Sequence, residues 1–244
     1  MTTASDRCRG GAWDVVRELH PEFLDAYVKM AEVPERSGHL DPKVRAFVAL
    51  AIDANVTHLD PDGMRSRLRE ARAAGASPEE ILEVLECSAT VSVHAMNVGV
   101  EVLLDVLQER GERTGAAPLT SYQDELKSNF ATRRGYWNPT WDDILKVAPE
   151  MFEAYTAFSS VPWTTGHLSP LVKELIYIAF DTSVTHLYRV GLKLHIENAL
   201  GYGASAEQVL EVMELATLIG MKSVLVGAPL LQAELSAEAG SPTS

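Results

Sequence analysis

Cysteine, basic charge and long apolar runs are all scarce in this sequence. Only two cysteines, Cys8 and Cys87, occur in 244 residues, and neither belongs to a C-x-x-C pair. This excludes a disulfide framework and indicates a reduced, cytoplasmic protein. The formal net charge of −13 leaves no basic stripe for a nucleic-acid backbone. No run of 18 uncharged apolar residues is present, so we expect no membrane-spanning segment, and the N-terminus lacks the apolar core of a secretory signal.

What is present is an internal duplication. A shift of 128 residues, which carries Trp13 onto Trp141, aligns the two halves without a gap, and about a third of the aligned positions are identical. Self-similarity of this kind indicates a repeat architecture. Two copies are too few for a solenoid, so we expect two repeats, 13–108 and 136–236, to pack about a pseudo-twofold axis. The polar segment 109–135 between them is predicted to be a linker.

Each repeat carries the start signals of a series of helices. Asp41 and Ser169 each precede a proline, the arrangement of an N-cap residue followed by the first residue of a helix. The segments that follow are apolar almost all round, so we place them in the core. A later helix in each repeat starts with a capping box, at 77–80 and at 205–208. No segment alternates with the period of a strand, and the sequence predicts an all-α fold.

The helix before each capping box carries a different inward-facing basic residue in each repeat. At about 100° per residue, His195 falls on the same face as Tyr188, toward the core. The matching residue of the first repeat is Arg67, and an inward guanidinium needs an anion. Arg67 could pair with a core carboxylate such as Asp53, could bind the carboxylate of a substrate, or could lie exposed if the helix phase is different. The sequence leaves these three accounts open.

More titratable side chains surround the second copy of this helix. A turn could bring His186 and His195 together beside Asp181, as a proton-transfer set in which the carboxylate orients one imidazole. Tyr188 could donate a hydrogen bond or a proton to the same site. Structural roles explain the same residues: core packing for Tyr188 and His195, and capping of helix carbonyls for His186 and its counterpart His58.

Two residues stand outside this set. His94 has no histidine counterpart, because Lys222 occupies the matching position, and we interpret it as incidental. Arg189, beside Tyr188 in the sequence, is a second candidate for holding an anion.

The order of the motifs is more specific than any one of them. Each repeat has G-x-L before a proline-started helix and then a buried apolar helix, and the second repeat continues with H-x3-A-L-x2-G-A-S and E-x-x-L-E-V. This frame, over 38–107 and 166–235, resembles the carboxymuconolactone decarboxylase and AhpD-like superfamily. The resemblance implies an all-helical bundle whose repeats pair and assemble into rings of six. A chain with two AhpD-like repeats would then form a homotrimer, with a dimer as the alternative.

Peroxidase members of that superfamily carry C-x-x-C four residues before the histidine that corresponds to His195. Here the two cysteine positions hold Tyr188 and Gly191, and in the first repeat they hold Asp60 and Gly63. A dithiol peroxidase needs an attacking thiolate and a resolving partner. The sequence therefore argues against thiol peroxidase chemistry.

The resemblance then implies the thiol-free decarboxylase branch, in which the matching histidine performs acid–base chemistry on a small carboxylated lactone. We expect a cofactor-independent lyase or isomerase that acts on a small carboxylated or oxygenated ring compound. An arginine would hold the substrate carboxylate while a proton is delivered to carbon. The candidate catalytic residues are His195, His186, Tyr188 and Asp181, and the candidate substrate-binding residues are Arg67, Arg189 and His58.

Two other classes of function stay open. One is a small-acid-binding or assembly protein of the same fold without catalysis. The other is a metal-dependent enzyme that uses His186, His195 and Asp181 or Glu197, although a nine-residue histidine spacing is not a standard ligand motif. No phosphate-cradling glycine motif is present, so no cofactor is predicted. The expected partner is a small-molecule substrate, with no role for nucleic acid or a membrane.

Overall fold

The computed structural model describes residues 3–112 and 117–240, and these residues form helices and connecting loops without any β-strand. The all-α prediction is confirmed. The first half of the chain contains α1 (Ala4–Arg7), α2 (Ala12–Leu19), α3 (Pro21–Ala31), α4 (Val33–Ser37), α5 (Pro42–Asp53), α6 (Pro61–Ala73), α7 (Pro78–Ala89), η1 (Thr90–Val93) and α8 (His94–Glu109). The rest contains α9 (Ser121–Arg134), α10 (Trp141–Val147), α11 (Pro149–Thr165), α12 (Pro170–Thr182), α13 (Arg189–Gly201), α14 (Ala206–Thr217), η2 (Leu218–Met221) and α15 (Lys222–Gly240).

The predicted helix starts are present in both repeats. The Asp41 side chain accepts a hydrogen bond from the backbone N–H of Lys43 at the start of α5, and the Ser169 hydroxyl accepts one from the N–H of Val172 at the start of α12. Complete capping boxes open α7, through Ser77, and α14, through Ser205. Each cap satisfies first-turn amides that have no partner within the helix.

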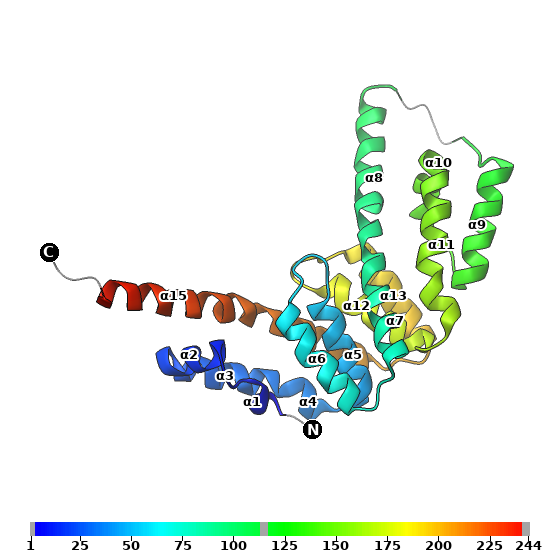
Figure 1. Cartoon of the computed structure of the whole chain (residues 1–244). Helices are drawn as coiled ribbons and strands as arrows, with labels where there is room; N and C mark the ends of the chain where they lie inside the picture. The colour runs from blue at the N-terminus through cyan, green and yellow to red at the C-terminus, as the bar shows by residue number, and fades with distance from the viewer. Residues whose placement is uncertain (1–2, 113–116, 241–244) are drawn as a thin grey trace.

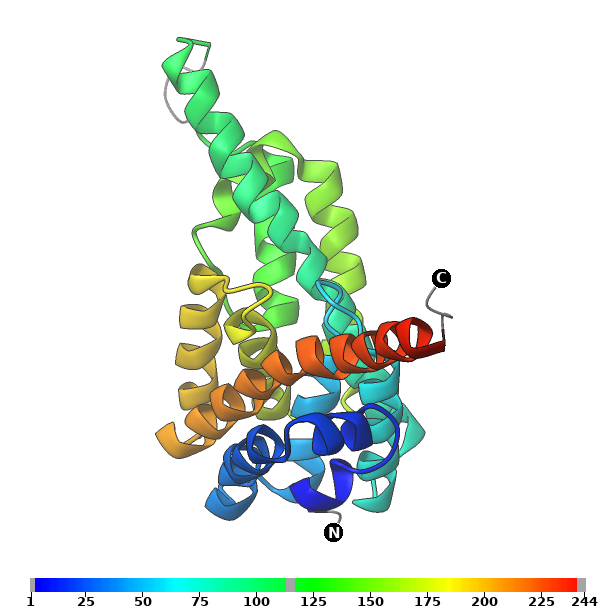
Figure 2. The same cartoon turned by 90° about the vertical axis from the view of Figure 1, so that its left-hand side faces the viewer.

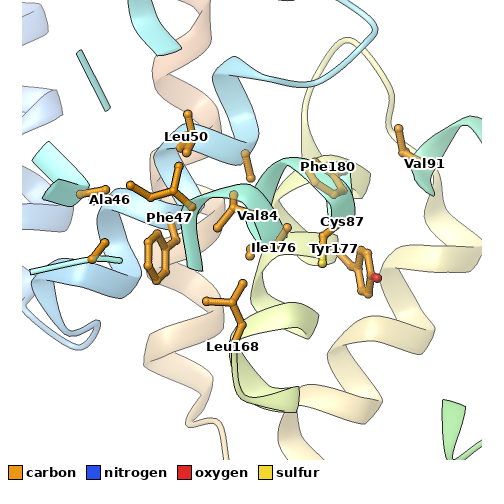
Figure 3. Close-up of a cluster of buried hydrophobic side chains, with 14 residues drawn as sticks. Ala46, Phe47, Leu50, Val84, Cys87, Val91, Leu168, Ile176, Tyr177 and Phe180 are labelled. Atoms are coloured by element: carbon orange, nitrogen blue, oxygen red, sulfur yellow. The ribbon is translucent and has the colours of Figure 1, made fainter. Parts of the chain in front are cut away.

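Helices α5 and α12 lie at the centre of the molecule and pack on each other. Figure 3 shows one of the two clusters built around them, in which side chains of α5, α7 and α12 interdigitate. The second cluster combines α5 and α12 with α13 and α14. Both clusters draw on both repeats, so neither repeat has a core of its own. The residues labelled in the first cluster include Phe47 and Leu50 of α5, Val84 and Cys87 of α7, and Ile176, Tyr177 and Phe180 of α12.

A reciprocal pair of buried carboxylates holds the repeats together about the pseudo-twofold axis. Glu83 accepts backbone hydrogen bonds from His167 (3.2 Å) and Leu168 (3.0 Å) of the second repeat. Its counterpart Glu211 accepts the equivalent bonds from the first repeat. Each carboxylate also pairs with a cation of the opposite repeat: Glu83 with Lys173 at 2.8 Å, and Glu211 with Arg45 at 2.7 Å. Two such cross-repeat contacts can arise only if the repeats exchange places under a rotation of about 180°.

The Glu83–Lys173 and Glu211–Arg45 pairs, called clamps here, give a matched test of stability. Lys173 is 1 % exposed, so Glu83→Ala leaves a buried ammonium group unpaired and is expected to lower the free energy of unfolding by about 3–5 kcal/mol. Glu211→Ala leaves Arg45, whose side chain is 17 % exposed and can reach water, so we expect a smaller loss, about 1–3 kcal/mol. Urea denaturation of both variants measures the difference. Equal losses, or a larger loss for Glu211→Ala, would contradict this account of the clamps.

The long helix at the end of each repeat crosses to the other repeat. Figures 1 and 2 show α8 running beside α9, α10 and α11, and α15 running along α2 and α3. The segment 109–135, predicted as a linker, contains α9, and its Leu126 and Phe130 are buried in the cluster beneath α8. The α9 part of this segment is therefore part of the packed structure. The exchange of α8 places first-repeat residues next to the second repeat's candidate site residues.

One helical stretch, Pro78–Glu109, is long and apolar enough to cross a membrane by length and composition alone. It combines α7, η1 and α8, and 28 % of its most apolar window is buried. The same test is passed by core helices of other proteins, so it carries little weight for a single helix. In this chain α7 contributes Val84 and Cys87 to the central cluster.

Candidate functional site

A cavity of about 50 Å³ lies at the junction of α8, α9, α11, α12 and α13. One water molecule needs about 10–15 Å³ of such space, so the cavity is several times larger than a single water site. Its walls include His195 and Asp181 of the second repeat, His94 of the exchanged first-repeat helix, and Arg134 of α9. His195 therefore lies beside a concave chamber.

His195 faces inward, as predicted, and is held by a buried carboxylate. The residue is 8 % exposed, and Nδ1 lies 2.6 Å from Oε2 of Glu174 on α12. Glu174 is fully buried and also accepts a hydrogen bond from Asn198 at 3.1 Å. Since a carboxylate can only accept, Nδ1 of His195 is the donor, and Nε2 is left to exchange a proton. Glu174 was not among the sequence candidates, and the partner of His195 is this residue, not Asp181.

Arg134 supplies a positive charge to the cavity wall. The residue is 6 % exposed. Its guanidinium donates to the carbonyl of Ser159 at 3.0 Å and to the hydroxyl of Tyr136 at 3.3 Å, and stacks over the Trp163 ring at 4.7 Å. Nε has no hydrogen-bond partner, and no carboxylate of the described residues pairs with this side chain. A buried cation without a counter-ion is unfavourable unless an anion joins it. Arg134 is thus a candidate anion-binding group that sequence analysis did not identify.

Three tyrosines complete this part of the wall, and all stay protonated near neutral pH. Burial raises the pKa of Tyr155 to about 12, and burial raises the pKa of Tyr136 and Tyr177 as well. The Tyr177 ring lies 4.7 Å from the His195 ring. The cavity therefore offers neutral hydroxyl groups to a ligand next to the Arg134 guanidinium and the imidazoles of His195 and His94.

Asp181 lies beside His186, but the second histidine of this cluster is His94 and not His195, which was predicted to join them. Oδ1 of Asp181 is 3.7 Å from Nε2 of His186 and 3.7 Å from Nδ1 of His94, and the two histidine nitrogens are 2.6 Å apart. The interpretation of His94 as incidental is wrong, because the exchange of α8 brings it to the site. Burial raises the pKa of Asp181 to about 7 and lowers that of His94 to about 3.

Tyr188 and Gly191 lie at the start of α13 and line the cavity. The Tyr188 ring packs on the His94 ring at 4.0 Å between centroids. Gly191 faces Asp181 so closely that a Cβ atom there would lie 2.2 Å from Oδ2. The buried carboxylate therefore requires glycine at this position.

The equivalent region of the first repeat is filled by ion pairs. Arg67, the counterpart of His195, lies 3.4 Å from Oδ2 of Asp53 and 2.9 Å from Oε2 of Glu70. Lys222, the counterpart of His94, bridges Asp53 (2.5 Å) and Asp60 (2.9 Å). Pairing of Arg67 with Asp53 was one of the three accounts left open by the sequence. Arg67 lines a separate cleft and does not line the cavity beside His195.

The other predicted substrate-binding residues also lie off the cavity wall. Arg189 is exposed at the start of α13. His58 is half-buried next to the pseudo-twofold axis, with Nδ1 3.2 Å from the hydroxyl of Thr185. Thr57 and Thr185, which are counterparts, meet there at 2.8 Å.

Comparison with known proteins agrees with this architecture. The model of the carboxymuconolactone decarboxylase family matches residues 21–102 and 149–228, one match in each repeat. The chain belongs to the carboxymuconolactone decarboxylase family. It is also similar to the crystal structure of a Burkholderia xenovorans LB400 protein inferred to be a gamma-carboxymuconolactone decarboxylase subunit, with 50% sequence identity, a TM-score of 0.93 and 96% of each chain covered. A search of curated proteins found no match.

The structure gives a physical reason why one of the two cysteine positions of peroxidase relatives does not carry a thiol in this chain. The positions where peroxidase relatives would carry cysteine are Tyr188 and Gly191, and a side chain at 191 would collide with Asp181. The two cysteines of this chain are free and buried elsewhere, and burial raises the pKa of Cys87 to about 12. A thiol with so high a pKa is a poor nucleophile.

Proposed function

We propose that the protein is a cofactor-independent acid–base lyase that decarboxylates a small ring compound carrying a free carboxylate. The observation that carries the proposal is the shared cavity of the buried Arg134 and the His195–Glu174 pair. Membership of the carboxymuconolactone decarboxylase family and the similarity to the Burkholderia protein support decarboxylase-like activity in general.

Arg134 has the chemistry to bind and orient the substrate carboxylate. The anion would supply the counter-charge that the guanidinium lacks, and burial strengthens the interaction because water does not screen it. Most of the binding energy would come from this pair, while the tyrosine hydroxyls would contact oxygens of the ring.

His195 would supply the proton. As the bond between the ring carbon and CO2 breaks, its electron pair moves onto the ring, where hydrogen bonds from the tyrosines stabilise developing negative charge on oxygen. Nε2 of the imidazolium form then protonates the carbon, and the Nδ1 contact with Glu174 stabilises that charged form. One proton is consumed for each CO2 released, and it returns to His195 from solvent.

We propose one such cavity per chain. In the first repeat, the positions of His195 and His94 hold Arg67 and Lys222, and both cations are bonded to carboxylates of the chain. That arrangement leaves no imidazole for proton transfer.

The test is CO2 release by the purified protein from gamma-carboxymuconolactone and related lactones that carry a free carboxylate. The same rings with a methyl ester in place of the acid serve as controls, because they cannot pair with Arg134 or lose CO2. We expect release from at least one free acid and from none of the esters. No release from any free acid in the series would contradict the proposal.

A further inference from the structure

Donor atoms of three residues converge beside the cavity. One atom each from His94, Asp181 and His186 lies within 4.8 Å of the others. The carboxylate oxygen is 3.7 Å from each imidazole nitrogen. Ligand atoms placed about 2.1 Å from a tetrahedral cation are about 3.4 Å apart, so the spacing suits three ligands of a single ion. The histidine nitrogens, at 2.6 Å, would need to separate by less than about 1 Å.

Asp181 is the residue whose environment points most strongly to a cation. It is 1 % exposed, and Oδ2 has no hydrogen-bond partner. No lysine or arginine of the described residues forms an ion pair with it, and its neighbours at 3.7 Å are imidazoles. A buried carboxylate without a cation or a full set of hydrogen bonds is unfavourable.

The first repeat shows how the equivalent carboxylate is neutralised. Asp53, the counterpart of Asp181, lies 2.5 Å from the ammonium group of Lys222, and Asp60 lies 2.9 Å from the same nitrogen. The counterpart of Lys222 is His94. Beside Asp181, an imidazole therefore occupies the position that an ammonium group occupies beside Asp53. A second imidazole, that of His186, then lies within 2.6 Å of it. The exchange removes a cation and places one further nitrogen ligand beside the imidazole of His186, whose counterpart in the first repeat is His58.

We propose that His94, Asp181 and His186 bind a divalent first-row transition cation, of the Zn²⁺ or Fe²⁺ type, in a site of two histidines and one carboxylate. Imidazole nitrogen favours these ions over Mg²⁺ and Ca²⁺, which prefer oxygen ligands. Three protein ligands leave at least one coordination position open. Since His94 and Asp181 also line the cavity, a bound cation would lie next to it.

The site goes beyond the proposed decarboxylase, because neither Arg134 nor the His195–Glu174 pair is a ligand. It also combines residues of both repeats: His94 comes from α8, and the other two ligands come from the end of α12 and the loop that follows. A chain cut between the repeats would lack one ligand.

The experiment measures cation binding directly, without substrate. Tag-free protein is treated with a chelator, dialysed and titrated with Zn²⁺ by calorimetry, and with Co²⁺ by visible absorption. We expect one cation per chain. His186→Gln and His94→Lys should each weaken binding by at least about 100-fold, because each removes a ligand and even loss of a ligand's supporting contact costs about 10–100-fold. His94→Lys restores the arrangement of the first repeat, and circular dichroism checks that both variants fold.

His58→Gln is the matched control, since His58 is the counterpart of His186 and should leave cation affinity unchanged. His195→Gln should also bind the cation normally. The proposal is overturned if the wild-type chain does not bind Zn²⁺ or Co²⁺, if His186→Gln and Asp181→Asn bind as well as the wild type, or if His58→Gln weakens binding equally. Because no turnover is measured, these outcomes are independent of whether CO2 is released.

Discussion

Replacing His195 with Gln is expected to lower kcat for CO2 release by about 10²–10⁴-fold while the fold is retained. Glutamine is similar in size, and its amide can still donate a hydrogen bond to Glu174, so the buried carboxylate keeps a partner. It cannot carry a proton to carbon. The loss should appear in kcat, with a smaller change in KM, because His195 acts on the transition state more than on the bound acid.

Two further variants define the source of that loss. Glu174→Gln keeps the hydrogen bond to His195 but removes the charge that stabilises an imidazolium, so we expect kcat to fall as well. Arg67→Gln changes the counterpart of His195 in the first repeat, where the side chain is bonded to Asp53 and Glu70, and should leave turnover largely intact. Full activity in His195→Gln with a native circular dichroism spectrum would sink the proton-transfer role.

Replacing Arg134 with Met is expected to weaken binding of the substrate acid by about 30-fold to several thousand-fold, corresponding to about 2–5 kcal/mol for the loss of one partner of a buried charge pair. Methionine fills much of the same volume and can pack on Trp163, so the cavity wall is kept. Arg134→Lys keeps the charge but lacks the planar fork, and should fall between the wild type and the methionine variant. Calorimetric titration with a non-reacting acid of the same shape measures the affinity.

The methyl ester of that acid is the control ligand for Arg134. Because the ester carries no charge, its affinity should be similar for the wild type and for Arg134→Met. If the methionine variant binds the free acid as tightly as the wild type does, the carboxylate does not contact Arg134. A thermal melt separates loss of binding from loss of fold, since Arg134 also donates to Ser159.

Much of the architecture could be predicted because its signals are short local motifs and because each motif occurs in both repeats. The caps at Asp41 and Ser77 depend on neighbouring residues, and the duplicated sequence repeats each signal 128 residues later. The inward direction of His195 follows from helical periodicity alone. The burial of His195 could therefore be predicted from the sequence.

The missed residues depend on contacts that a single repeat does not contain. His94 looked incidental because it breaks the repeat pattern, and only the exchange of α8 shows why it differs. Arg134 lies in the segment predicted as a linker, and its burial follows from the packing of α9 on α11. Glu174 did have a local signal, since it interrupts an apolar core helix where the first repeat has Ala46. A charge at a buried position of only one repeat is the signal that could have singled out Glu174.

The most direct test of the account compares CO2 release from the free acid by the wild type, His195→Gln and Arg67→Gln under one set of conditions. The account predicts release by the wild type and by Arg67→Gln, and at least about 100-fold slower release by His195→Gln. Release by all three at similar rates, or loss in Arg67→Gln alone, would contradict the claim that the second-repeat cavity performs the chemistry.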